Sequence, residues 1–237
     1  NPDTYQNYTY QCNGRFKHGE DVINCFHGTA HGGESFTKSF AKSCNASFAN
    51  ISVQLDKNSY GDTLEDLLFN SELPVSFTYN KSSVIVNEDV SDSDVMQASI
   101  GQGTDSITPL HMNMITCAIA NDGVLMKPYL IDRVENENGN VIKQFSSGAY
   151  GSLITEQEAE ALTQLMTEVV ESGTATKLKG SGYTAAGKTG SAEYNKVKTD
   201  SHAWFTGFAP VENPQICVTV IIEGAGSGGD FAVPIAK

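Results

Sequence analysis

The sequence is poor in basic residues and has no long hydrophobic run. Its 237 residues include 15 Lys and Arg against 28 Asp and Glu, which gives a net charge of −13. This acidic balance argues against nucleic acid and anionic membrane surfaces as partners. No window approaches eighteen consecutive apolar residues, so no membrane-spanning helix is predicted in this stretch. The chain opens at Asn1 without an initiator Met or a signal-peptide pattern, so we expect any export signal or anchor to lie upstream.

The hydrophobic and aromatic content of the chain is typical of a folded globular protein. Hydrophobic residues make up 39% and aromatic residues 9% of the chain, which excludes a disordered polypeptide. The length suits one large domain or two small ones.

Cysteine and histidine gather in the first fifth of the chain. Residues 1–33 show no sustained periodicity, so they are predicted to be loop with short strands at most and to need another source of order. The spacing Cys12-x12-Cys25-x5-His31-x12-Cys44 offers one, because three thiolates and an imidazole form a complete tetrahedral set for structural zinc.

Two alternatives to zinc stay open: a Cys12–Cys25 disulfide, which would fit an exported protein, and free thiols. His27 is the competing imidazole, and His18 is interpreted as a solvated loop residue. The two remaining cysteines, Cys117 and Cys217, lie in apolar surroundings and are predicted to be ordinary buried thiols.

The middle of the chain is predicted to be largely helical. Aromatic residues four apart indicate two short helices between residues 34 and 55, which meet near Ser43. Residues 58–94 are predicted to hold a short helix and then loop. Thr108 and Pro109 are suited to begin a helix that runs to Ala120. A hairpin is expected across residues 132–151.

The last third combines one helix with strands. Thr155 and Glu158 form a capping-box pattern at the start of a long amphipathic helix that ends at Ser172-Gly173. Antiparallel strands are expected at residues 183–193, 202–208 and 215–222, with turns at 195–200 and 210–214 and a terminal helix starting near 231. The last of these strands has the composition of a central strand. The predicted fold class is α+β, with an antiparallel sheet flanked by helices.

The segment around Lys188-Thr189-Gly190 is the most informative part of the sequence. Small and β-forming residues predict a buried strand, which would normally exclude lysine. A cation, a hydroxyl and a glycine in succession can hold a carboxylate, donate a hydrogen bond and let a substrate backbone approach closely. A second short motif, Ser43-Cys44-Asn45, places a hydroxyl and an amide at the predicted helix junction. Taken alone, Ser43 would simply cap that junction, and Lys188 would be a solvated residue on an edge strand.

Together these motifs resemble the transpeptidase domain of penicillin-binding proteins. Ser43-Cys44-Asn45 is similar to the Ser-x-Asn motif of the family, and Lys188-Thr189-Gly190 is similar to its Lys-Thr-Gly motif. Four further stretches match in the order of the family, namely residues 98–103, 118–129, 171–175 and 204–208. The resemblance implies a single domain over residues 1–237. Its parts would be 1–57 with the Ser-x-Asn helices, 58–170 as a helical part and 171–237 with the Lys-Thr-Gly strand.

The resemblance implies acyl transfer on peptidoglycan. A serine would attack a D-Ala-D-Ala stem peptide, and an amine from a neighbouring stem would resolve the acyl-enzyme, while β-lactams would mimic the substrate. Lys188 would hold negative charge, Thr189 would bind the substrate carboxylate and Gly190 would let a peptide lie along the strand. Further implied roles are a proton relay by Ser43, amide binding by Asn45 and an oxyanion-hole N–H from Ala192.

The nucleophile motif of the family, Ser-x-x-Lys, has no convincing match. The strings Ser35-Phe-Thr-Lys38 and Ser39-Phe-Ala-Lys42 fit by letter but lie on the helix that runs directly into Ser43. We interpret both as the polar side of that helix, because the resemblance places the nucleophile on a separate helix upstream. The chain is therefore expected to begin after its nucleophile, to lack acylation activity and to have a fold incomplete at both ends.

The resemblance also bears on cofactors, partners and location. Catalysis would need no cofactor, while a structural zinc beside the Ser-x-Asn loop would hold Ser43 and Asn45 in place. Partners would be stem peptides, β-lactams and cell-wall assembly proteins, at an extracytoplasmic site reached through an upstream membrane anchor. The alternatives are a β-lactamase or β-lactam sensor on the same fold, and a non-catalytic, zinc-stapled wall-binding module.

Overall fold

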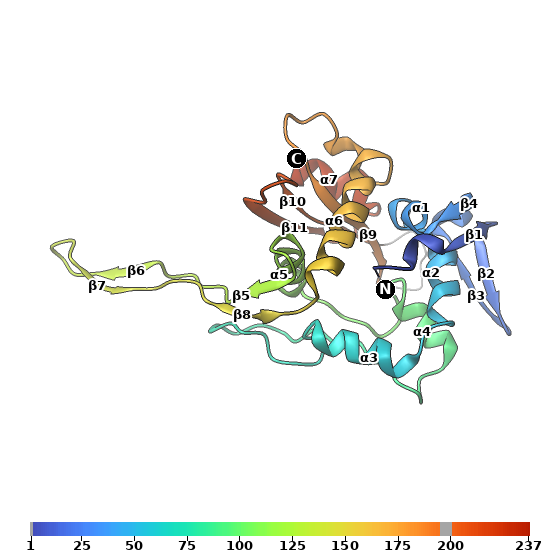
Figure 1. Cartoon of the computed structure of the whole chain (residues 1–237), viewed down its shortest axis with the longest axis horizontal. Helices are drawn as coiled ribbons and strands as arrows, with labels where there is room; N and C mark the ends of the chain where they lie inside the picture. Colours follow the sequence, from blue (N-terminus) through green and yellow to red (C-terminus); the bar gives the residue numbers. More distant parts are fainter. Residues whose placement is uncertain (1, 195–200) are drawn as a thin grey trace.

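The centre of the molecule is a three-stranded antiparallel sheet, seen in a computed structural model that describes residues 2–194 and 201–237. Its strands are β9 (Ala186–Glu193), β10 (Ser201–Ala209) and β11 (Ile216–Ile222), in the order β11-β10-β9 (Figure 1). Phe208 of β10 lies opposite both Ala186 of β9 and Cys217 of β11. The prediction of consecutive antiparallel strands is therefore confirmed, although the expected turn at 195–200 falls outside the described residues.

Helices cover both faces of this sheet. On one face α5 (Pro109–Ala120) and α6 (Glu156–Glu171) pack over a cluster that contains Met166, Ala186 and Phe208. On the other face the helical turn η4 (Gly228–Ala232) and α7 (Val233–Ala236) pack against Phe205. The predicted α+β class is confirmed by this arrangement.

The prediction that residues 215–222 form a central strand is wrong. Within the described residues β11 is an edge strand, and Ile216 is 59% exposed. The apolar composition of β11 has another cause. Helix α5 packs on one face of the strand and α7 on the other, so both faces need apolar side chains even without a second neighbouring strand.

The N-terminal part consists of short strands and helices around the cysteines. Its strands are β1 (Thr9–Cys12), β2 (Arg15–His18), β3 (Asp21–Asn24) and β4 (Gly32–Ser35), which pair as β1-β4 and β2-β3. The short turn η1 (Tyr5–Asn7) precedes β1, and η2 (Phe26–Gly28) lies between β3 and β4. The two predicted helices follow as α1 (Phe36–Ala41) and α2 (Asn45–Ser52). His18 belongs to β2 and not to a loop, and its half-exposed side chain has a partner, since its Nε2 lies 2.9 Å from Asp92 Oδ2.

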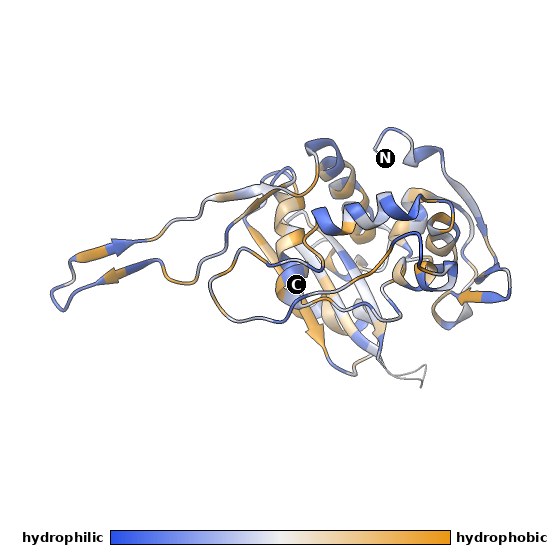
Figure 2. Ribbon diagram, turned by 90° about the horizontal axis from the view of Figure 1, so that it is seen from below, coloured by the Kyte–Doolittle hydropathy of each residue, from blue (hydrophilic) through white to orange (hydrophobic). Residues whose placement is uncertain are grey.

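The middle segment leads from helices to a projecting hairpin. Helices α3 (Lys57–Asp66) and α4 (Asp92–Ala98) come first, then α5, which begins at the predicted Thr108 cap and Pro109. Strands β5 (Val124–Met126) and β8 (Ala149–Ser152) pair at the base of an arm whose outer part is β6 (Arg133–Glu135) and β7 (Val141–Gln144). Figures 1 and 2 show this arm extending away from the body, with apolar and polar residues mixed along it.

The predicted capping box is present at α6. The Thr155 side chain accepts from the Glu158 backbone N–H, and the Glu158 carboxylate accepts from the Thr155 N–H at 2.8 Å. After α6 the chain passes through a short turn, η3 (Thr176–Leu178), and enters β9. No helix among the described residues is long and apolar enough to cross a membrane.

Candidate functional site

A cleft of about 730 Å³ lies between the α1–α2 junction and β9. It brings together side chains 145 residues apart in sequence, since Ser43 lines one wall and Lys188 the other. Five of the six predicted catalytic and substrate-binding residues line it, namely Ser43, Asn45, Lys188, Thr189 and Gly190.

Ser43 and Lys188 are in direct contact. Lys188 Nζ donates to Ser43 Oγ at 2.5 Å and to the Thr189 carbonyl oxygen at 3.0 Å, and it lies 5.5 Å from the centre of the Phe40 ring. Burial lowers the pKa of Lys188 to about 8. The ammonium group is therefore mostly charged at neutral pH and loses its proton as the pH rises through about 8, which suits both charge stabilisation and proton transfer.

Ser43 holds an unusual backbone conformation. Its φ of +53° lies in the left-handed region, which residues other than glycine seldom adopt. Ser43 is not the N-cap of α2, which is Cys44, but it does end α1. Its N–H donates to the Phe40 carbonyl at 3.2 Å and the Cys44 N–H donates to the Ser39 carbonyl at 2.9 Å, the pattern of a left-handed C-terminal cap. The interpretation of Ser43 as a cap of the junction therefore holds at the end of α1, and the tight junction directs its hydroxyl to Lys188.

Asn45 stands at the start of α2, beside the cleft. Its Nδ2 donates to the Asn24 carbonyl oxygen at 3.1 Å, which fixes the amide. Among the described residues no hydrogen bond occupies Asn45 Oδ1, so that oxygen is free to accept an amide N–H of a ligand.

The β9 wall presents hydroxyl groups and an accessible backbone. Thr189 and Thr174 approach within 2.5 Å through their hydroxyls, so the segment after α6 contributes to the cleft. A Cβ added at Gly228 would lie 2.4 Å from the Gly190 carbonyl oxygen, which shows how closely the η4 turn approaches β9. Within the described residues, β9 pairs with β10 alone and its other edge is open.

Ala192 does not line this cleft but a neighbouring cavity beside Trp204. Ser191 lines the cleft instead, and its Oγ accepts from the Gly228 N–H at 3.2 Å. The sequence interpretation did not select Ser191 or Thr174. The alternation of a strand that already carries Thr189 would have indicated Ser191.

The two Ser-x-x-Lys strings are not catalytic pairs in this structure. Lys38 Nζ donates to the Gly33 carbonyl at 2.7 Å, and Lys42 Nζ donates to the Ser172 carbonyl at 2.5 Å, so both ammonium groups bind backbone. Ser35 is the N-cap of α1. Our interpretation of Ser39 as part of a polar helix side is wrong, because Ser39 is fully buried and hydrogen-bonded to Ser47 at 2.7 Å.

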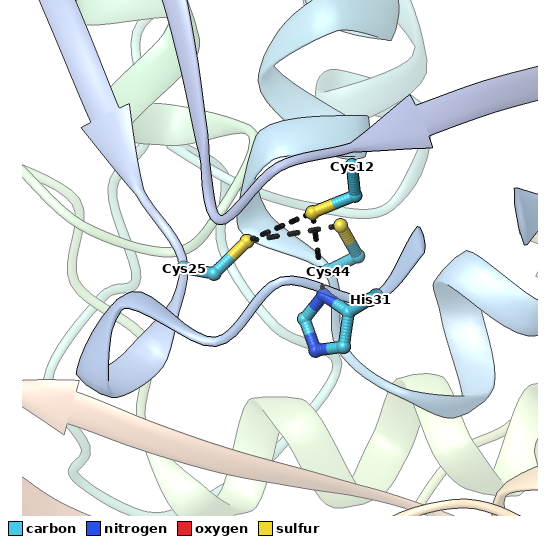
Figure 3. Close-up of side chains that lie close together, drawn as sticks. All are labelled: Cys12, Cys25, His31 and Cys44. Atoms are coloured by element: carbon cyan, nitrogen blue, oxygen red, sulfur yellow. Dashed lines mark hydrogen bonds between the residues drawn. The ribbon is translucent and has the colours of Figure 1, made fainter. Parts of the chain in front are cut away.

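The four predicted metal ligands converge beside the Ser-x-Asn motif (Figure 3). Cys12 Sγ lies 3.7 Å from Cys25 Sγ and 3.5 Å from His31 Nδ1, and Cys25 Sγ lies 3.8 Å from Cys44 Sγ. All four ligand atoms lie within 4.8 Å of one another. Sulfurs bound to one tetrahedral zinc at 2.3 Å would be roughly 3.8 Å apart, so the donors and their spacing fit that ion.

The cysteines in this cluster are free, and the structure has no Cys12–Cys25 disulfide. A hydrogen bond from Cys44 is the main cause that lowers the pKa of Cys25 to about 5, which favours a thiolate. His27 does not belong to the group. Cys117 and Cys217 are only half-buried and interact with each other, since a hydrogen bond between them lowers the pKa of Cys117.

Comparison with known proteins identifies the family. The model of the penicillin binding protein transpeptidase domain matches residues 4–237, so the chain belongs to this family. Peptidoglycan D,D-transpeptidase PbpA of Mycolicibacterium smegmatis is 31% identical over 215 residues, which cover 86% of this chain and 42% of PbpA. Peptidoglycan D,D-transpeptidase MrdA of Haemophilus influenzae is 27% identical over 237 residues, which cover 88% of this chain and 36% of MrdA. The chain thus spans less than half the length of these relatives.

Solved structures share the fold. The D,D-transpeptidase domain of a peptidoglycan glycosyltransferase from Eggerthella lenta has a TM-score of 0.89 and 27% identity, over 97% of this chain and 58% of that one. Penicillin-binding protein PBP2 from Helicobacter pylori has a TM-score of 0.80 and 26% identity, over 98% of this chain and 43% of that one.

Proposed function

We propose that this chain supplies the substrate-binding cleft of a peptidoglycan D,D-transpeptidase and that its ligands are D-Ala-D-Ala stem peptides and β-lactams. The contact between Ser43 Oγ and Lys188 Nζ carries the proposal, because it joins the two motifs across the cleft. Membership of the transpeptidase family supports it, and the names of the relatives favour this function over a β-lactamase or a β-lactam sensor.

The roles follow from the geometry of the cleft. The protonated form of Lys188 holds the terminal carboxylate of the peptide together with the Thr189 hydroxyl. Asn45 Oδ1 accepts an amide N–H of the same peptide. The open edge of β9 at Gly190 lets the peptide lie antiparallel to the strand and form backbone hydrogen bonds. A backbone N–H at Ala192, or at Ser191 on the cleft wall, stabilises the oxyanion.

None of these 237 residues is the acylated serine in this proposal. In the complete reaction a serine Oγ forms a bond to the carbonyl carbon of the penultimate D-Ala, and the bond from that carbon to the terminal D-Ala nitrogen breaks. The proton of the serine hydroxyl passes to the leaving amine through the Ser43–Lys188 pair. An amine of a second stem then attacks the ester carbon and forms an amide bond, the ester bond breaks, and a proton of that amine returns to the serine oxygen.

Two solved relatives suggest ligands and partners. One solved structure is penicillin-binding protein A from M. tuberculosis as an acyl-enzyme complex with ceftriaxone. Another is the complex between PBP2 and MreC from Helicobacter pylori. We therefore extend the proposal to β-lactam binding and to a cell-wall assembly partner, at an extracytoplasmic site that the protein reaches through a membrane anchor outside these residues.

The proposal is tested by titrating the ¹⁵N-labelled chain with benzylpenicillin and recording intact mass on the same sample. We expect shifts of the Ser43, Asn45 and Thr189 amides and no covalent adduct. Absence of shifts at the cleft would overturn the proposed function. A stoichiometric adduct on Ser35 or Ser39 would overturn the placement of the nucleophile.

The Cys12, Cys25, His31 and Cys44 cluster supports a second, structural function as a zinc site. The spacing of the donor atoms favours it, and all three cysteines are buried. Zinc would supply a rigid cross-link among β1, the segment before α1 and the start of α2. Because Cys44 lies between Ser43 and Asn45, holding its sulfur fixes both cleft residues.

Elemental analysis of tag-free protein tests this assignment. We expect about one zinc per chain, and less than a tenth of that after the Cys44→Ser substitution. The Cys117→Ser variant, which alters a cysteine outside the cluster, is the control and should keep its metal. Wild-type protein with well under one zinc per chain would exclude the site.

A further inference from the structure

Two cysteines outside the metal cluster, Cys117 and Cys217, meet where α5 packs on β11 (Figure 1). Neither has a role in the proposed cleft or in the zinc site. Each is half-buried, and the two thiols form a hydrogen bond with each other. Because they come from segments far apart in the sequence, only the packing of the helix on the sheet brings them together.

The register between the helix and the strand accounts for this meeting. Asn113 lies one helical turn before Cys117 on α5, and Thr219 lies two residues after Cys217 on β11. Asn113 Oδ1 accepts from the Thr219 hydroxyl at 3.1 Å, and Asn113 Nδ2 donates to Cys117 Sγ at 3.8 Å. One turn along α5 covers about 6 Å and two residues along β11 about 7 Å. The step that leads from Asn113 to Cys117 therefore matches the step from Thr219 to Cys217.

A chain of hydroxyl groups holds the helix on the sheet beside the cysteines. The Thr116 hydroxyl lies 2.6 Å from that of Thr206, which in turn lies 2.7 Å from that of Thr219. Thr116 and Thr206 are buried. These hydrogen bonds fix α5 against β10 and β11, so the two sulfurs are held in contact and need to close only to the disulfide bond length of about 2 Å.

The hydrogen bond makes the two thiols chemically unequal. Cys217 donates to Cys117, which lowers the pKa of Cys117 and raises the pKa of Cys217. The thiolate is the form of cysteine that attacks a disulfide. Cys117 is therefore the sulfur that reacts first, and Cys217 is placed to complete the exchange.

We propose that Cys117 and Cys217 form a reversible disulfide that links α5 to β11, with a low-molecular-weight disulfide as the oxidant. The Cys117 sulfur bonds to one sulfur of that molecule, whose S–S bond breaks and releases one thiol. The Cys217 sulfur then bonds to Cys117, and the mixed disulfide breaks to release the second thiol. The protein thiols are oxidised, the small disulfide is reduced, and both protons go to the released thiols.

The cross-link would act on the support of the cleft and not on its ligand. The closed loop contains α6, β9 and β10, and a loop of about 100 residues is one for which a disulfide restricts the unfolded chain strongly. Thr206 lies opposite Lys188 in the β9–β10 register, so the linked helix packs directly behind that part of the sheet. An extracytoplasmic site, as proposed above, would supply oxidising conditions. The inference itself depends only on the contact between α5 and β11.

Oxidation of the full chain tests the proposal. Protein prepared with zinc is incubated with oxidised glutathione, its remaining thiols are alkylated, and tryptic peptides are mapped by mass spectrometry. We expect one pair of peptides joined through Cys117 and Cys217, with the loss of two hydrogen atoms and reversal by dithiothreitol. Calorimetry on the same samples should show a melting temperature about 5 to 15 °C higher in the oxidised protein.

Two variants provide the controls. Cys217→Ser should form no cross-link, should accumulate the mixed disulfide of Cys117 with glutathione, and should gain no thermal stability on oxidation. The double substitution Cys217→Ser with Val218→Cys keeps the number of thiols but moves one to the opposite face of β11, where Val218 lines a cavity beside α7. This displaced thiol should not bond to Cys117.

Three results would overturn the proposal. The first is wild-type protein in which both thiols stay free, or carry glutathione separately, although the melting transition shows that the protein is folded. The second is equal cross-linking of the displaced thiol, which would show that the register does not select the pair. The third is a cross-linked protein that melts no higher than the reduced one, which would contradict a bond formed without distortion of the α5–β11 contact.

Discussion

At the scale of single residues, the site depends on one contact, from Lys188 Nζ to Ser43 Oγ. The Lys188 ammonium is enclosed by Phe40, Ser43 and the β9 backbone, so that burial brings its pKa down to about 8. The left-handed backbone of Ser43 directs its hydroxyl toward that ammonium. The pair can therefore hold a carboxylate when Lys188 is charged and accept a proton when it is neutral.

This protonation makes ligand affinity depend on pH. Because Lys188 is charged below its pKa and neutral above it, affinity for an anionic D-Ala-D-Ala peptide should fall as pH rises through about 8. Calorimetric titration from pH 6 to pH 9.5 measures the change. Lys188→Met should bind weakly at every pH and show no such step. Affinity that is constant across this range in the wild type would contradict the assigned role of Lys188.

The residues of the site could be predicted from sequence only where they belong to a short motif. Ser43, Asn45, Lys188, Thr189 and Gly190 belong to two tripeptides, and these could be recognised because both occur in one chain, in the order of the family. The contact between Ser43 and Lys188 could not, since it depends on how α1, α2 and β9 pack. The burial of Ser39 and the pairing of His18 with Asp92 were missed for the same reason.

At the scale of elements, the arm formed by β6 and β7 contributes little to the core. Every residue of these two strands is exposed, and a two-stranded ribbon has little stability of its own. Replacing residues 130–146 with Gly-Gly should leave the melting temperature within about 3 °C of the wild type. Differential scanning calorimetry provides the measurement. Leu125→Ala, at a buried position on β5, is the destabilising control and should cost about 2 to 5 kcal/mol.

Unlike the arm, the capping box at the start of α6 is expected to contribute to stability. Thr155→Ala removes the side-chain oxygen that accepts from the Glu158 N–H and should lower the free energy of unfolding by about 1 kcal/mol. Urea denaturation measures this change. The Thr155→Ser variant keeps a hydroxyl and should retain most of the stability. Equal losses in the two variants would show that the cap is not the cause.

Elements with local signals were predicted correctly, and those defined by their neighbours were not. Thr108 with Pro109 marks the start of α5, and Thr155 with Glu158 marks the start of α6, because each end is fixed by hydrogen bonds within four residues. The position of β11 at the sheet edge is a property of the whole sheet. Its apolar sequence reflects the helices on its two faces and not a partner strand.

At the scale of the whole molecule, the metal cluster links the N-terminal strands to the cleft. Zinc bound there should stabilise the protein, so adding a chelator should lower the melting temperature by more than 5 °C. Acidification should release the metal, because the thiolates and the imidazole take up protons as the pH falls. The cluster mutant Cys44→Ser should already melt at the lower temperature, with no further effect of the chelator. A chelator-independent melting temperature in the wild type would contradict a structural role.

The central claim is that the cleft recognises the stereochemistry of D-Ala-D-Ala. It is tested most directly by titrating the ¹⁵N-labelled chain with Nα,Nε-diacetyl-L-Lys-D-Ala-D-Ala and with the same peptide ending in L-Ala-L-Ala. The account predicts saturable shifts at Ser43, Asn45 and Thr189 with the D,D peptide and at least tenfold weaker binding of the L,L peptide. In the Lys188→Met variant, the shifts with the D,D peptide and the preference for it over the L,L peptide should both disappear. Equal binding of the two stereoisomers, or shifts that avoid these three residues, would contradict it.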